Sequence, residues 1–128
     1  MNVPISGCRI PVLASFLVLL ALEVPTRVAA ALPLAECLRA DRIDRWHVEG
    51  ERALLVRSGG RHFRVELRRD CPDLGRGGFL SLSGAQTMRD FVCGNVGENV
   101  KARYGDCAIG VVSPLSRGEF LKQVERAR

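Results

Sequence analysis

The chain has 128 residues and a formal net charge of +5, from 19 lysines and arginines against 14 aspartates and glutamates. The charges are interspersed, and because no run of five or more like charges occurs, the composition excludes a charged tail that binds nucleic acid. The sequence contains no internal repeat and no low-complexity tract, so a single small domain is expected.

Residues 1–30 are predicted to be a cleavable signal peptide. Arg9 provides a positive start, Ile10 to Leu22 form an apolar run of 13 residues, and Val28-Ala29-Ala30 supplies small residues for signal peptidase. The apolar run is shorter than the roughly 20 residues that a membrane-spanning helix needs. Cleavage near Ala30 predicts a periplasmic or secreted protein, and a retained anchor is the alternative.

Residues 31–128 are predicted to form one small β-rich domain. Without Arg9, Glu23 and Arg27 they carry 17 basic and 13 acidic residues, a net charge of +4, which suits an anionic envelope surface or an acidic partner. A domain of this size buries only about two-thirds of its unfolded surface, so it benefits from covalent cross-links.

Three strands are predicted at residues 43–48, 52–58 and 61–69. The Gly59-Gly60 pair tolerates the positive φ angles of a two-residue hairpin turn. That turn places Val56 opposite Phe63 and Leu54 opposite Val65, so these apolar side chains share one face with Leu67 and form the expected core side.

The first turn of this meander is predicted at residues 49–51, which sets Trp46 opposite Leu54 on the apolar side. His62, Arg64 and Glu66 then alternate onto the other face, which is predicted to face water. His47 falls on the same polar side. A solvated histidine is therefore favoured over a histidine metal site.

The rest of the chain continues the β pattern. Residues 73–78 are rich in glycine and predict a loop, and they lack the lysine and hydroxyl residue of a phosphate-binding loop. Strands are predicted at 79–83, 91–93 and 107–112, and residues 97–103 pair with 107–113 if residues 104–106 turn. Ser116 and Glu119 form a capping-box pattern before Phe120, Leu121 and Val124, which predicts a C-terminal helix.

The predicted fold is mainly β, a small antiparallel meander or barrel-like domain with a short C-terminal α-helix, cross-linked by disulfides. Four cysteines stay after the signal, Cys37, Cys71, Cys93 and Cys107, and an exported chain favours two disulfides. We expect Cys37 to pair with Cys71 and Cys93 with Cys107. The second pair conflicts with the turn at 104–106, which places Cys93 far along the strand from Cys107.

Alternative uses of these cysteines are less well supported by the sequence. Their spacing contains no C-x-x-C pair, which disfavours a zinc site and a redox enzyme, and an oxidised cysteine cannot act as a nucleophile. Cys8 leaves with the signal. Glu36 before Cys37 disfavours a lipid anchor.

Several of these residues carry a resemblance to a known family. They are the run 61–67 followed by Cys71-Pro72 and Leu74, then Phe91-Val92-Cys93, Cys107-Ala108-Ile109, Pro114-Leu115-Ser116 and Glu119. Together they resemble the family catalogued as domain of unknown function 6491, small exported bacterial proteins of which some are lipid-anchored. Where many members have an aromatic residue after the first cysteine, this chain has Leu38. The resemblance implies fold and compartment and supplies no catalytic residue, cofactor or activity.

Catalytic and nucleic-acid-binding sites are disfavoured. Ser81 or Ser83 with His62 and Asp90 could form a hydrolytic triad, but no nucleophile elbow surrounds either serine. Base stacking needs exposed aromatic side chains, and only Tyr104 and Phe79 lie off the predicted core face. The sequence therefore predicts no enzyme, no cofactor, no metal and no nucleic-acid partner.

Two functions are compatible with these predictions. One is a non-catalytic binding or structural module of the bacterial cell envelope, which engages an envelope component or an exported protein. The other is a protein inhibitor of an exported hydrolase that inserts a loop, residues 75–78 or 94–98, into a cleft. An inhibitor is expected to hold one loop preorganised, because flexibility in the free state lowers affinity.

Overall fold

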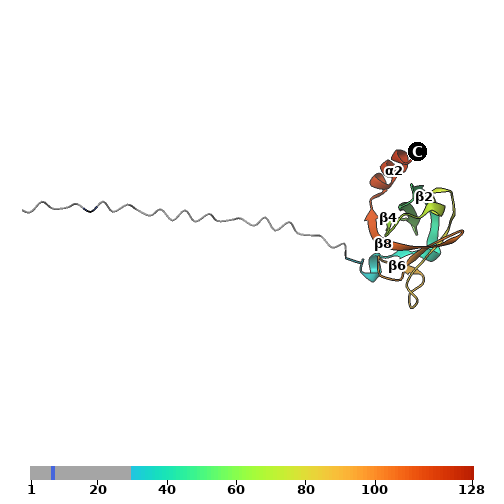
Figure 1. The fold of residues 1–128 in the computed structure, drawn as a ribbon, viewed down its shortest axis with the longest axis horizontal. Helices are drawn as coiled ribbons and strands as arrows, with labels where there is room; N and C mark the ends of the chain where they lie inside the picture. The colour runs from blue at the N-terminus through green and yellow to red at the C-terminus, as the bar shows by residue number, and fades with distance from the viewer. Residues whose placement is uncertain (1–6, 8–29) are drawn as a thin grey trace, which may run out of the picture.

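The computed structural model describes residue 7 and residues 30–128, so nearly all of the predicted signal peptide lies outside the described residues. Within the described part, no helix is long and apolar enough to cross a membrane. The domain is mainly β, with a curled antiparallel sheet and a short helix at the C-terminus, as the sequence predicts (Figure 1).

The elements follow one another without long gaps. In chain order they are η1 (Leu34–Glu36), β1 (Leu38–Arg39), η2 (Ala40–Arg42), β2 (Ile43–Glu49), β3 (Ala53–Ser58), β4 (Arg61–Leu67), α1 (Pro72–Gly75), β5 (Phe79–Ser83), β6 (Phe91–Val92), β7 (Asn99–Ala102), β8 (Gly105–Leu115) and α2 (Arg117–Arg126).

Six strands form the main sheet in the order β2-β3-β4-β8-β7-β5, and all neighbours are antiparallel. The sheet curls into a half-barrel (Figure 1). Its two edge strands, β2 and β5, therefore approach each other. The Trp46 ring of β2 packs on the Phe79 ring of β5, with 5.0 Å between centroids. We call the region between these two edges the seam.

The β3–β4 hairpin has the predicted register. Gly59 and Gly60 have φ angles of 58° and 80°, as a two-residue turn of this kind requires, and Phe63 lies opposite Val56. In the β2–β3 pair the prediction was wrong by two residues, because the loop covers residues 50–52 and Trp46 lies opposite Val56. Trp46 keeps its predicted face but remains 47% exposed at the sheet edge.

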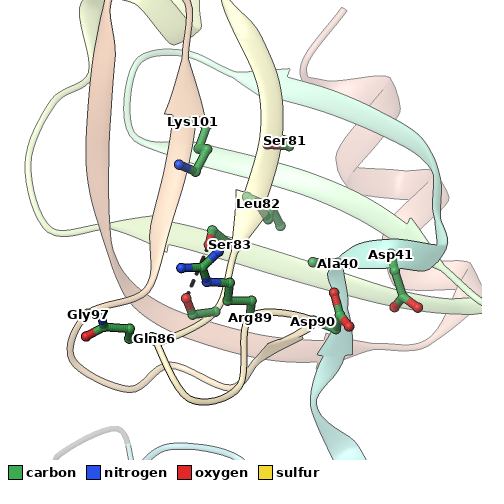
Figure 2. Close-up of a pocket in the computed structure, with 11 residues that line it drawn as sticks. Ala40, Asp41, Ser81, Leu82, Ser83, Gln86, Arg89, Asp90, Gly97 and Lys101 are labelled. Carbon is green, nitrogen blue, oxygen red and sulfur yellow. Dashed lines mark hydrogen bonds between the residues drawn. The ribbon is translucent and has the colours of Figure 1, made fainter.

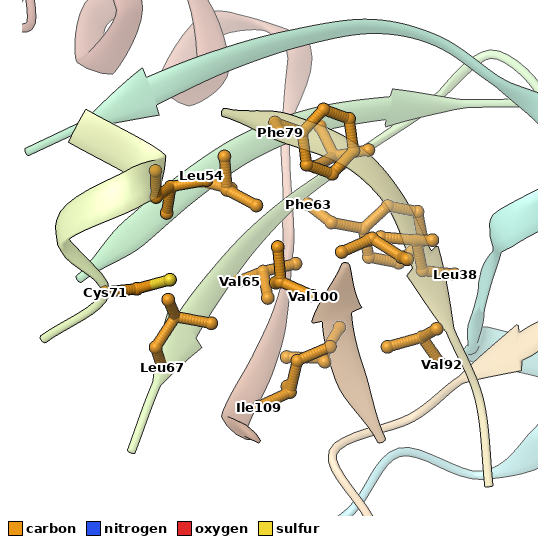
Figure 3. Close-up of a cluster of buried hydrophobic side chains, with 14 of the residues drawn as sticks. Leu38, Leu54, Phe63, Val65, Leu67, Cys71, Phe79, Val92, Val100 and Ile109 are labelled. Carbon is orange, nitrogen blue, oxygen red and sulfur yellow. The ribbon is translucent and has the colours of Figure 1, made fainter. Parts of the chain in front are cut away.

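The core lies inside the curl of the sheet. Phe63, Val65 and Leu67 of β4 are buried there, in agreement with the predicted apolar face. Figure 3 shows these side chains packed with others from six further strands, β1, β3, β5, β6, β7 and β8. The labelled residues from those strands are Leu38, Leu54, Phe79, Val92, Val100 and Ile109.

The outer face of β3 and β4, predicted to face water, is partly covered by α2. Ser116 caps α2 by accepting a hydrogen bond from the Glu119 N–H at 3.1 Å, as the capping pattern predicts. The helix then buries Phe120 and Val124 against Leu55, whose exposed fraction is 0%. The prediction that this face is exposed to water was wrong where α2 lies over it, because the amphipathic helix packs its apolar side on Leu55 of that face.

The disulfides join Cys37 to Cys93 and Cys71 to Cys107, so both expected pairings were wrong. Leu38 of β1 pairs with Val92 of β6, which brings the neighbouring residues Cys37 and Cys93 together. The β4–β8 pairing places Leu67 opposite Ile109, so Cys71, which follows β4, comes close to Cys107 near the start of β8. Long-range strand pairing therefore decides the connectivity.

Two smaller differences follow from local geometry. The loop predicted at 73–78 begins as the short helix α1, with Pro72 at its first position, where a missing N–H costs no hydrogen bond. The last hairpin turns at residues 103–104, because Ala102 pairs with Gly105, and β8 extends to Leu115.

A candidate binding groove at the sheet seam

A polar groove of about 530 Å³ lies at the seam, beside β5 (Figure 2). Its volume falls within the range of about 300 to 1,000 Å³ that is common for ligand sites. The lining comes from η2, β5, β7 and the loops 84–90 and 94–98: Ala40, Asp41, Ser81, Leu82, Ser83, Gly84, Gln86, Arg89, Asp90, Gly97 and Lys101.

Both ends of the groove are fixed by contacts between distant parts of the chain. At the start of β5, Phe79 packs on Trp46. At the other end, the Ala40 N–H donates to the Asp90 carbonyl at 2.8 Å. These two contacts therefore tie β5 and the loop 84–90 to the segment that contains η2 and β2.

The loop 84–90 forms the end wall and is itself tightly built. The Gly84 N–H donates to the Arg89 carbonyl at 2.8 Å, and the Met88 N–H donates to the Ala85 carbonyl at 2.8 Å. A Cβ at Gly84 would collide with the carbonyl oxygens of Met88 and Phe91, so this loop closes only around a glycine.

Charges of both signs border the groove. Figure 2 shows Asp41 and Asp90 on the η2 side, while Lys101 extends from β7. Arg39 donates from Nε and a terminal nitrogen to the two Asp41 oxygens at 3.0 and 2.9 Å, and this hydrogen bonding lowers the pKa of Asp41.

The other charged groups of the groove are less engaged. The Lys101 ammonium lies 4.0 Å from an Asp106 carboxylate oxygen. Arg89 and Asp90 join no ion pair among the described residues. Both side chains are available to a charged ligand, although the charge of Asp90 also contributes to raising the pKa of nearby Arg39.

The residues of the possible hydrolytic triad are divided between two sites. Ser81, Ser83 and Asp90 line the groove. His62 lies in a different cavity of about 300 Å³ with Arg57 and Arg117. The structure therefore brings the serines and the aspartate together and leaves the histidine apart from them.

His62 is not the solvated side chain that the sequence predicts, because α2 lies over it. Its ring packs on the Phe120 ring, with 4.7 Å between centroids. Desolvation, followed by the charges of Arg57 and Arg117, lowers the pKa of His62 from 6.5. His47 approaches the same Phe120 ring edge-on at 6.2 Å, so both histidines serve packing under the helix. Within residues 30–128 the structure contains no cluster of three His, Cys, Asp or Glu side chains that could hold a metal.

Arg64, on the same face, is the centre of a polar network. It donates to Glu49, to Glu66 at 3.1 Å and to the Gln123 oxygen of α2 at 3.0 Å. The hydrogen bond with Glu49 is the main cause that raises the pKa of Arg64 above its usual value. This network ties the helix to the sheet and leaves the arginine occupied.

The loop 94–98 is anchored by a residue whose role the sequence analysis missed. The Glu98 carboxylate is buried, 2% exposed, and accepts three backbone N–H groups, from Cys93 at 2.8 Å, Gly94 at 2.6 Å and Asn95 at 2.9 Å. Successive N–H groups of this kind form a concavity that binds anions, and here the chain supplies its own anion. The disulfide at Cys93 and a carboxylate with three donors therefore fix this loop, with Val96 at its tip 77% exposed.

The two aromatic residues considered for base stacking differ in exposure. Tyr104 is 78% exposed at the β7–β8 turn, with the Arg103 guanidinium 5.6 Å from its ring centre. Phe79 is buried under Trp46. A platform for successive bases would need a second exposed ring beside Tyr104.

Comparison of the chain with family models, with curated proteins and with solved structures finds no match. The likeness to domain of unknown function 6491 therefore stays a prediction from the sequence.

Proposed function

We propose that this chain is an exported, non-catalytic binding module of the bacterial cell envelope, and that the seam groove is its ligand site. The observation that carries the proposal is the position of the groove, where the curled sheet leaves an edge strand without a partner beside two unpaired charged side chains. Ligand sites commonly combine a preformed cavity with a few polar groups that fix orientation.

Export is supported by the two disulfides, because cross-links of this kind persist in oxidising compartments. It also agrees with the predicted signal peptide and with the family resemblance. Intact-mass measurement of the protein recovered from the periplasm or medium tests this part. A mass that lacks residues 1–30 is expected, and a mass that includes them would contradict cleavage.

A non-catalytic role is supported by how the ionisable side chains are used. Asp44 forms a bidentate ion pair with Arg57, with contacts of 2.9 and 2.8 Å, and Arg64 is held by two glutamates. Catalysis instead needs titratable groups that converge on one reacting atom. The groove holds serines without a histidine beside them.

Site-specific photo-crosslinking tests the groove as the binding site. A photoreactive residue at Gln86, in the groove wall, is expected to give a discrete adduct in the producing cell. The same residue at Lys122, exposed on α2, serves as the matched control. The Gln86 adduct should disappear when Arg89→Glu and Asp90→Lys are combined. Equal labelling at both positions, or none at Gln86, would overturn the assignment.

A second candidate function is inhibition of an exported hydrolase through the loop 94–98. The order imposed on this loop by Glu98 favours it, because a preorganised loop loses little freedom on insertion. Inhibition assays against a panel of exported proteases and glycosidases test it, with Val96→Asp as the disabling variant. Absence of inhibition across the panel, or inhibition unchanged by Val96→Asp, would reject this function.

A further inference from the structure

The free edge of β5 presents backbone hydrogen-bonding groups to the groove. Ala102 and Gly105 flank the two-residue turn of the last hairpin, so they bond to each other. Because the bonding direction alternates along a strand, Lys101 and Asn99 face β5, where they pair with Ser81 and Ser83.

Leu82 lies between those two bonded residues, so its N–H and C=O point away from β7 and into the seam. Its side chain is buried in the core, yet Leu82 lines the groove, which agrees with a backbone that faces it. Among the described residues, no turn or side-chain hydrogen bond uses these two groups. Unpaired backbone groups at a sheet edge are a template for another strand.

The groove restricts what can reach this edge. On one side stands η2, and at one end the loop 84–90; beyond the lining residues, the Trp46–Phe79 contact closes the seam near the start of β5. A strand that belongs to a folded sheet brings neighbouring strands with it and collides with these walls. A single extended segment does not.

We propose that the seam groove binds an extended polypeptide segment of another protein, which pairs with β5 through the N–H and C=O of Leu82. This inference rests on the proposed function and names the ligand class for the same groove. Strand addition of this kind takes its affinity from backbone hydrogen bonds and its specificity from alternate side chains.

The charges at the groove end indicate which segments fit. Arg89 and Asp90 are adjacent, opposite in sign and free of ion pairs among the described residues. A segment that carries a basic residue near Asp90 and an acidic residue near Arg89 gains both contacts. The ligand is therefore a segment with charges of both signs, and a uniformly acidic or basic segment satisfies one of them only.

The test uses linear heptapeptides selected from a random phage-displayed library against the oxidised protein. In amide NMR spectra, the selected peptide should shift the Leu82 resonance and slow its hydrogen exchange, while the Val100 amide, which faces β8, should not change. N-methylation at every second peptide nitrogen should weaken binding by about tenfold, and methylation at the nitrogens between them should not. Asp90→Lys should lose binding of the selected peptide, and Asp70→Lys, outside the groove, should not.

The outcomes separate this inference from the proposed function. Peptides that shift groove resonances but tolerate every N-methyl group would overturn strand pairing and leave the groove as a binding site. Failure of every peptide, with the Gln86 adduct still formed, would overturn the polypeptide class alone. Failure of both experiments would overturn the groove itself. A concentration-dependent dimer in which the Leu82 amide is protected without peptide would make a second copy the occupant and reject another protein.

Discussion

Glu98→Gln is expected to destabilise the domain by about 2 to 4 kcal/mol, although the substitution keeps the size of a buried side chain. Glutamine can present its single oxygen to the N–H groups of Gly94 and Asn95, which now share one carboxylate oxygen at 2.6 and 2.9 Å. Its NH₂ group then faces the Cys93 N–H, which loses its acceptor. One lost charge-assisted bond contributes about 1.5 to 3 kcal/mol, and the two retained bonds weaken because the acceptor is no longer charged.

Urea denaturation of the wild type and variant measures this loss. Glu98→Ala removes both acceptor oxygens, and with them all three hydrogen bonds, and is expected to cost more, about 3 to 6 kcal/mol. Glu125→Gln is the matched control and should stay within about 0.5 kcal/mol, because Glu125 is exposed on α2 and its side chain joins no ion pair among the described residues. A Glu98→Gln loss below about 1 kcal/mol, with an unchanged m-value, would refute the anchoring role of the carboxylate.

Phe63→Ala is expected to cost about 3 to 5 kcal/mol because it empties part of the core, and a loss below 1 kcal/mol would contradict that burial. His62→Ala is expected to lower the unfolding free energy by about 1 kcal/mol, since it removes a ring that packs on Phe120. No change in the same denaturation experiments would indicate that the His62 ring is exposed to solvent. The pKa of His62 is lowered from 6.5 in the folded state, so on acidification the unfolded state binds the proton first. The stability that this difference contributes is present above pH 6.5 and decreases as the pH falls from 6.5 towards the lowered pKa. His62→Gln should flatten this pH dependence of the unfolding free energy, and an identical slope in the variant would contradict the lowered pKa. The disulfides close loops with sequence separations of 56 and 36 residues, and each contributes about 4 kcal/mol to the unfolding free energy in the chain-entropy model. Reduction should therefore lower the melting temperature strongly. Peptide mapping that finds any other pairing would reject the connectivity.

Features set by neighbouring residues could be predicted from the sequence. Gly59-Gly60 fixes the β3–β4 register because only a few residue pairs adopt two successive positive φ angles. Ser116 and Glu119 fix the start of α2 by local hydrogen bonding. In both cases the deciding interaction spans three or four residues.

Features set by long-range packing could not be predicted. The pairing of Cys37 with Cys93 depends on β1 lying beside β6, which no spacing of cysteines encodes. The cover of α2 over His62 and Leu55 depends on where the helix docks after β8. The alternation of residues along β4 correctly predicts which side chains share a face, but it does not predict which element covers that face.

The residues of the groove and of its neighbouring loop left little signal in the sequence. The segment 94–98 has the composition of a solvent-exposed loop, so Glu98 does not stand out in it. Only the two nearby glycines, Gly94 and Gly97, indicate a tight turn in which the backbone can fold back on an acceptor. The sequence indicates Asp90 only as a possible triad member and does not indicate Arg89 or Lys101, because their convergence depends on the curl of the sheet.

The two disulfides interleave along the chain, since Cys71 lies inside the loop closed by Cys37–Cys93, and Cys93 lies inside the loop closed by Cys71–Cys107. A single peptide-bond cleavage anywhere between Cys37 and Cys107 therefore leaves the two fragments joined by at least one disulfide. The loops 75–78, 84–90 and 94–98 all fall within this stretch. A protease that cuts one of these loops therefore releases no fragment. Because the two fragments stay covalently linked, they can refold together into the same domain.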